Sequence, residues 1–133
     1  MHTFEIKSQK ENDIINITDK VSAIVEKSGV NAGICTVYVP HATAAIIINE
    51  NWDISVCKDI LKTLDQLIPK RNNYEHDKID GNSASHIKAS ILGPSETIII
   101  KAGKLQLGTW QGIALIELDG PKERKVFVKI IEG

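Results

Sequence analysis

Unbroken runs of isoleucine constrain the fold of this chain most strongly. Residues 46–48 and residues 98–100 are each three isoleucines in a row. β-Branched side chains favour strands, because a helix restricts their χ1 rotation against the preceding turn. Alternation of apolar and polar residues over 3–8 and over 124–131 predicts two further strands, each with one buried face. A substantial β-sheet is therefore expected.

Helices are expected where apolar residues recur at three- and four-residue spacing. This pattern predicts helices over residues 18–28, 53–67 and 82–92. A glycine at position 29 fits the residue that ends the first of them, and Pro69 closes the second. The side chains expected to cap the first N–H groups of these helices belong to Thr18, Asp53 and Asn82.

The remaining apolar segments complete the predicted order of elements. Further strands are expected over residues 32–39, 43–49, 97–101, 105–107 and 110–118. The short link through Pro40 favours antiparallel pairing of the first two of these. Because strands follow one another in pairs, the chain is predicted to be α+β, a single domain over 1–133. Its largely antiparallel, β-sandwich-like sheet would have helices packed on one side.

Charge and hydropathy narrow the classes of partner. The chain has 16 basic and 17 acidic residues, a net charge of −1, so a nucleic-acid backbone is not an expected ligand. No apolar stretch approaches the roughly 18 residues of a membrane span. A cytoplasmic protein that acts on a small molecule is expected. Abundant Ile, Lys and Glu with one Met and two Cys suggest a thermophilic source.

Three of the four histidines lie in polar segments outside the expected core. They are His41, after Pro40 at a strand end, His76, in the long polar loop 70–81, and His86, near a helix start. Three imidazoles are enough to bind a divalent metal such as zinc, or to act as acids and bases near neutral pH. No HExxH or similar spacing is present, so the metal prediction rests on residue type alone. Unconnected surface histidines are the alternative.

Each of these histidines has polar neighbours that could share its chemistry. Thr43 lies two residues beyond His41, on the same side of an extended chain. Asp77 follows His76 and could act as a base or orient a ring. Asn82 precedes His86 by four residues, which places both on one face of a helix.

A glycine-rich segment over residues 103–112 interrupts the isoleucine-rich sheet. It surrounds Trp110 and Gln111, which could stack on a ligand and hydrogen-bond to it where the backbone approaches closely. A bulge with a core tryptophan is the alternative. Ser83 and Arg124 could bind an anionic group, although an arginine after a turn is often only a surface charge.

Four motifs together resemble the YjbQ-like family. They are His41-Ala-Thr-Ala, Tyr74-Glu-His-Asp, Asn82-Ser-Ala-Ser-His and Leu107-Gly-Thr-Trp-Gln, and the resemblance covers essentially the whole chain. This family is catalogued as uncharacterised and is also labelled secondary thiamine-phosphate synthase. The resemblance implies a homotrimer with a site near subunit boundaries, lined by the motif histidines. Ala42 departs from the pattern, since a second threonine is expected there.

The resemblance implies a transferase that joins hydroxymethylpyrimidine diphosphate to a thiazole phosphate. A metal- or small-ligand-binding trimer is the alternative, as is a metal-assisted hydrolase with Asp77 or Glu50 as base. The expected catalytic residues are His41, Thr43, Asp77, Asn82 and His86. The expected substrate-binding residues are Ser83, Trp110, Gln111 and Arg124. The expected metal ligands are His41, His76 and His86.

Overall fold

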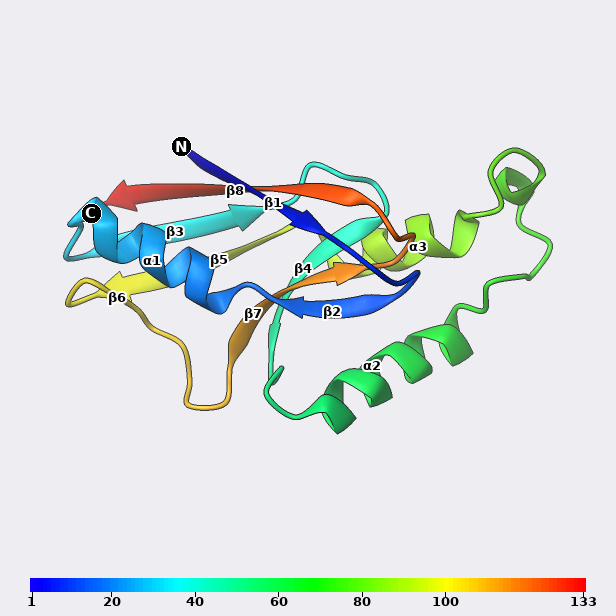
Figure 1. Cartoon of the computed structure of the whole chain (residues 1–133), viewed down its shortest axis with the longest axis horizontal. Coiled ribbons are helices and arrows are strands. Elements are labelled where there is room, and N and C mark those ends of the chain that lie inside the picture. The colour runs from blue at the N-terminus through cyan, green and yellow to red at the C-terminus, as the bar shows by residue number, and fades with distance from the viewer.

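A computed structural model describes all residues, 1–133. Figure 1 shows strands gathered on one side of the molecule and two helices extending from them. The helical elements are α1 (Thr18–Ser28), α2 (Ile54–Leu67), the short 3₁₀ helix η1 (Glu75–Lys78) and α3 (Ser83–Leu92). The strands are β1 (His2–Lys7), β2 (Asp13–Asn16), β3 (Gly33–Tyr38), β4 (Ala44–Asn49), β5 (Ser95–Lys101), β6 (Lys104–Leu105), β7 (Gly112–Glu117) and β8 (Glu123–Glu132).

The strands form two antiparallel sheets that share one apolar core. The larger sheet has the order β1-β8-β3-β5-β6 and the smaller has the order β2-β7-β4. Side chains from both sheets meet in the main core, among them Val37 and Val128 from the larger and Ile46 and Leu115 from the smaller, all fully buried. The predicted α+β class with a mainly antiparallel, sandwich-like sheet is confirmed.

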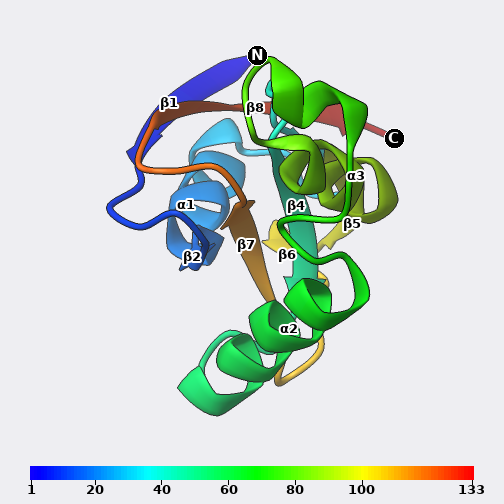
Figure 2. The same ribbon diagram turned by 90° about the vertical axis from the view of Figure 1, so that its right-hand side faces the viewer.

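The smaller sheet is covered on both faces, which explains the apolar sequence of β7. Every residue of β7 is buried. Leu115 points into the main core, whereas Ile116 packs with Ala45 and Ala89 in a second cluster on the opposite face, toward α2 and α3. The helix α1 instead places Val21 in the main core. Figure 2 shows α2 and α3 on the same side of β4 and β7, with α1 apart from them.

The helix α2 is only loosely embedded in the fold. None of its residues is buried, although Leu61 and Leu64 contact the second cluster. An ion pair between Asp65 and Lys88, with Nζ to Oδ1 at 2.5 Å, links α2 to α3. None of the helices in this fold has the length and apolar character needed to cross a membrane.

The expected hairpin of β3 and β4 is wrong. β3 pairs with β5 and β8, and β4 pairs with β7, so the two strands belong to different sheets. The short connection through Pro40 carries the chain from one sheet to the other instead of reversing it within one. Both edges of β3 are occupied by strands from later in the sequence, so none is left for β4.

The helix caps agree with the sequence in part. The Asp53 side chain accepts the Ser55 N–H at 2.8 Å, and Gly29 ends α1 with a left-handed φ of 71°, as predicted. Thr18 and Asn82 do not cap their helices, since neither makes a side-chain cap hydrogen bond. The Thr18 hydroxyl donates to Asn16 Oδ1 at 2.7 Å, and the Asn82 amide donates to Asp119 Oδ2 at 2.9 Å, while Asn82 Oδ1 has no partner.

Candidate functional site

Two of the three predicted histidines share one pocket at the N-terminus of α3. The rings of His76 and His86 meet edge to face, with centroids 5.0 Å apart. The pocket, of about 360 Å³, is also lined by Ser83, Tyr74 and Glu75, with Ile87 at its wall. The polar loop 70–81 folds back, forms η1 and brings His76 next to the helix that carries His86. The spacing of these residues in the sequence does not predict this contact.

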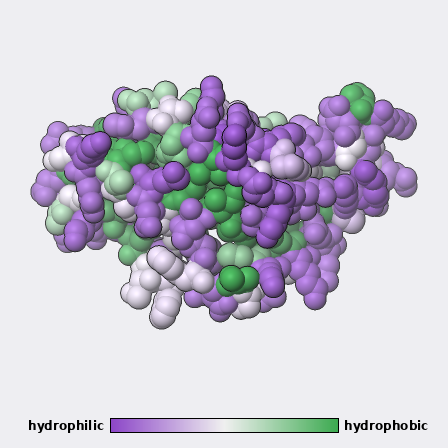
Figure 3. All heavy atoms as spheres, in the orientation of Figure 1, coloured by the Kyte–Doolittle hydropathy of each residue, from purple (hydrophilic) through white to green (hydrophobic).

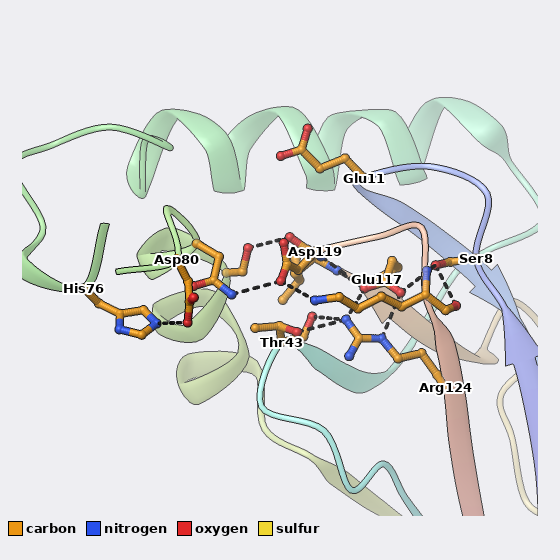
Figure 4. A network of polar contacts seen from close by, with 12 residues as sticks. Ser8, Glu11, Thr43, His76, Asp80, Glu117, Asp119 and Arg124 are labelled. Carbon is orange, nitrogen blue, oxygen red and sulfur yellow. Dashed lines mark hydrogen bonds and ion pairs between the residues drawn. The ribbon is translucent and has the colours of Figure 1, made fainter. Parts of the chain in front are cut away.

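Two buried polar atoms in this pocket have no hydrogen-bond partner in the protein. The Ser83 hydroxyl is one, and its side chain belongs to a residue that is only 6% exposed. The other is His76 Nε2, which lies 3.3 Å from Asp80 Oδ2 in an orientation that does not make a hydrogen bond. Figure 4 shows His76 and Asp80 facing each other at the edge of the polar network. Unpaired buried polar groups are costly, so a ligand that pairs with them gains affinity.

Asp77 lies next to this pocket but acts as the cap of α3. Its Oδ1 accepts the Ser83 N–H at 3.0 Å, and its Oδ2 lies 3.4 Å from the Arg71 guanidinium. The hydrogen bond from the Ser83 N–H holds the pKa of Asp77 below its usual value, and the nearby Ser83 hydroxyl and then the charge of Arg71 lower it further. A carboxylate with a lowered pKa is a weak base, so this geometry favours a positioning role for Asp77.

His41 lies in a different cluster, at the end of the β3–β4 connection. Its Nε2 accepts the backbone N–H of Lys125 at 2.9 Å, so the ring proton is on Nδ1. Burial lowers the pKa of His41, and the positive charge of Arg124 lowers it further against the opposing charge of Glu117. His41 is therefore held neutral, with Nδ1–H as its available donor.

Arg124 and Thr43 stand beside His41, and their polar groups are used within the protein. Arg124 is 3% exposed and forms a buried ion pair with Glu117. It also donates to the Thr43 carbonyl and hydroxyl oxygens, at 3.1 and 2.9 Å. Arg124 thus has a protein carboxylate as its counter-ion, in place of the substrate anion expected from the sequence.

Trp110 and Gln111 lie at the other end of the molecule, on the loop that joins β6 to β7. In Figure 1 this loop lies at the lower left, whereas η1 and α3 lie at the right. The Trp110 side chain is 69% exposed, which is not the core tryptophan of the alternative. Gln111 accepts the Gly108 N–H at 2.8 Å and closes the turn. Within one chain, Trp110 and the paired histidines do not meet.

The three predicted metal ligands do not form one group in this chain. No three His, Cys, Asp or Glu side chains lie in positions that could hold a metal ion together. His41 would also have to give up its hydrogen bond to Lys125, because a neutral ring has only one free lone pair. The residues of a single chain therefore do not fit a three-histidine metal site.

Two acidic residues of the site were missed from the sequence. Glu117 is fully buried and pairs with Arg124, and Asp119 accepts a hydrogen bond from the Asn82 amide at 2.9 Å. A signal was present, since Glu117 is the one charged residue in the apolar segment 113–118. A charge at a buried strand position requires a partner, and the nearby Arg124 was available to supply it.

The fold and these polar clusters define a small α+β protein with two antiparallel sheets and paired histidines at a helix start. The family described as "UPF0047 protein YjbQ-like" matches residues 2–133. A UPF0047 protein of Methanocaldococcus jannaschii is 50% identical over 128 residues, which cover 96% of this chain and 91% of that protein. The UPF0047 protein YugU of Bacillus subtilis is 40% identical over 131 residues, covering 98% of each chain. The chain belongs to the UPF0047, YjbQ-like family.

Solved structures give the same result for the fold. A YjbQ/UPF0047 family protein from Clostridium acetobutylicum is 50% identical and superposes with a TM-score of 0.95, covering 98% of this chain and 100% of that chain. A protein of unknown function from Sulfolobus solfataricus is 38% identical with a TM-score of 0.96, covering 99% and 96%. The family resemblance read from the four motifs is confirmed.

Proposed function

We propose that this protein joins hydroxymethylpyrimidine diphosphate to a thiazole phosphate, releasing pyrophosphate and forming thiamine phosphate. The observation that carries the proposal is the pocket in which His76 and His86 meet beside the unpartnered Ser83 hydroxyl. These groups offer hydrogen-bond donors at a helix N-terminus, where an anionic group is stabilised.

The proposed reaction requires little besides charge stabilisation. The C–O bond between the pyrimidine methylene and the diphosphate breaks, and its electron pair leaves on oxygen. The thiazole nitrogen then donates its lone pair to the methylene and forms the C–N bond. The protein contributes by stabilising the leaving pyrophosphate, and each well-placed donor of this kind is worth about 10²–10³ in rate.

The test is formation of thiamine phosphate by the pure protein from the two precursors. A His76→Ala/His86→Ala variant should lose at least about 10² of the rate, because both donors to the leaving group are removed. His2→Ala is the matched control, since His2 is exposed on β1 and should leave the rate unchanged. Equal rates for the double variant and the parent would refute this site, and no product from the parent would refute the reaction.

A binding function without turnover is the alternative. It is favoured by the role of Asp77 as the cap of α3, which occupies the carboxylate expected from the sequence to act as a base. Metal analysis of protein purified without an affinity tag would separate the two. Stoichiometric zinc with no thiamine phosphate formed would support metal binding, or a metal-assisted hydrolase, in place of the transferase.

We also propose that the protein is a homotrimer. Large apolar side chains remain open to solvent, with Ile54 70%, Leu67 73% and Trp110 69% exposed. Figure 3 shows apolar side chains in separate patches amid a hydrophilic surface. A neighbouring copy could bring Trp110 and Gln111 to the histidine pocket. Sedimentation velocity should give about three times the chain mass of 14.6 kDa, and a monomer at all concentrations would refute the trimer.

A further inference from the structure

A buried polar bridge connects the two predicted parts of the site. We define the bridge as Glu117, Arg124 and Thr43. Glu117 Oε1 accepts from Arg124 Nε at 2.9 Å, and its Oε2 from Arg124 Nη2, which donates in turn to both Thr43 oxygens. The Ser8 hydroxyl also donates to Glu117 Oε1, at 2.7 Å. Figure 4 shows these side chains pointing toward one another, Glu117 from β7, Arg124 from β8, and Ser8 and Thr43 from positions next to β1 and β4.

One end of the bridge fixes the segment that carries His41. Arg124 holds Thr43 by two hydrogen bonds, and the next residue, Lys125, donates its N–H to His41 Nε2. These contacts anchor both ends of residues 41–43 to the start of β8. Because the Lys125 N–H occupies Nε2, the anchored ring presents Nδ1–H.

The residues that follow Glu117 reach the other part of the site. Glu117 Oε2 accepts the N–H groups of Leu118 and Asp119, at 3.0 and 3.1 Å. Asp119 then holds the Asn82 amide, and the Leu118 carbonyl accepts the Ser85 hydroxyl at 2.6 Å. The first turn of α3, which carries Ser83 and His86, is thereby attached to the same strand end.

We infer that Glu117 is a positioning residue, which fixes the orientation and tautomer of His41 through Arg124 and Thr43. Its carboxylate accepts hydrogen bonds from two Arg124 nitrogens, from a hydroxyl and from two backbone N–H groups. A glutamine has a single acceptor oxygen and would turn an NH₂ group toward donors. This positioning role therefore requires a carboxylate at residue 117. Glu117 does not contact the substrate, since it is fully buried.

The test reads the tautomer of His41 directly, by ¹⁵N NMR of the full chain at one fixed, mildly alkaline pH. The parent should show the Nδ1–H form of His41 and a through-hydrogen-bond coupling between Lys125 N and His41 Nε2. Glu117→Gln should lose this coupling and populate both tautomers of His41, while the signals of His2, which is exposed on β1 and outside the bridge, stay unchanged. Glu123→Gln is the matched control, because Glu123 adjoins Arg124 in sequence but is exposed.

An unchanged His41 tautomer and coupling in folded Glu117→Gln would overturn the inference. If that variant does not fold, Glu117→Leu/Arg124→Met removes both charges at similar volume, a change that proteins often tolerate. It should also lose the coupling, and retention there would overturn the inference equally.

The catalytic consequence of this role rests on the proposed function. In a thiamine-phosphate assay, Glu117→Gln should lower kcat with little change in KM, because the strand end that Glu117 fixes also holds the first turn of α3 with its histidine pocket. Glu123→Gln should change neither. If the parent forms no product but the NMR result holds, the proposed function fails and the role of Glu117 stands.

Discussion

Removing Arg124 should destabilise the fold strongly, because it leaves Glu117 as a buried charge without a counter-ion. Glu117 is 0% exposed and Arg124 is 3% exposed, so water cannot replace the guanidinium. Breaking such a pair costs about 3–5 kcal/mol. Against a total stability of about 5–15 kcal/mol, Arg124→Met should lose at least about a fifth of it. With a urea slope near 2 kcal/mol per M, the unfolding midpoint should fall by about 2 M.

The loss of folding stability in Arg124→Met should depend on pH, which gives a second test of the same reasoning. Burial alone would raise the pKa of Glu117, but the hydrogen bonds from Arg124 and Ser8 outweigh it and hold the pKa below its ordinary value. In the parent, this stabilisation is present above the unfolded pKa and is lost as pH falls through the folded one. Without Arg124, acid protonates the unpaired carboxyl, so the deficit of Arg124→Met should shrink in acid.

Urea denaturation at neutral and at mildly acidic pH measures both effects. Lys7→Met is the matched control, because Lys7 pairs with Glu123 at the surface, with side chains 72% and 62% exposed. Exposed pairs contribute about 0–1 kcal/mol, so its midpoint should barely move. A loss below about 1 kcal/mol for Arg124→Met, or a loss that does not depend on pH, would refute the reasoning about a buried charge.

Two further predictions concern single contacts. Asp65→Ala should cost about 1–3 kcal/mol in urea denaturation, because it leaves the Lys88 amine, on a side chain 5% exposed, without its partner. Lys88→Met should cost less, since the Asp65 side chain is 56% exposed and regains water; equal costs would contradict this asymmetry. Gly120→Ala should lower the melting temperature more than Gly29→Ala, because its Cβ would lie 2.1 Å from the Lys10 carbonyl oxygen. The new Cβ at position 29 meets nothing within 4 Å and costs only the left-handed backbone, about 1 kcal/mol, so a larger loss at 29 would refute the steric argument.

Local patterns in the sequence predict the elements of this fold better than their pairing. Asp53 and the three- and four-residue spacing after it locate α2, because capping and amphipathicity act within a few residues. The separation of β3 from β4 depends on competition from strands that come after residue 94, which no local pattern contains. Asn82 fails as a cap for the same reason, since Asp119 attracts its amide from far along the chain.

The same contrast between local patterns and contacts made over long sequence distances applies to the candidate site. The polar surroundings of His76 and His86 mark them as residues outside the core, and the fold places their rings together. His41 has equally polar neighbours, yet the strand crossing between sheets takes it to Arg124 and Lys125 instead. The charge of Glu117 within an apolar strand was the one readable sign of the bridge that connects these clusters.

The positions of β7 and β8 in the sheets have a consequence for folding during synthesis. β1 pairs only with β8, while β2 and β4 pair only with β7, so these three early strands have no partner until residues 112–132 have been made. Contacts as distant as Phe4 with Val126 must overcome loop-closure entropy first, which slows folding. A nascent chain that lacks β7 and β8 exposes open strand edges and is prone to aggregation, so we expect it to depend on chaperones.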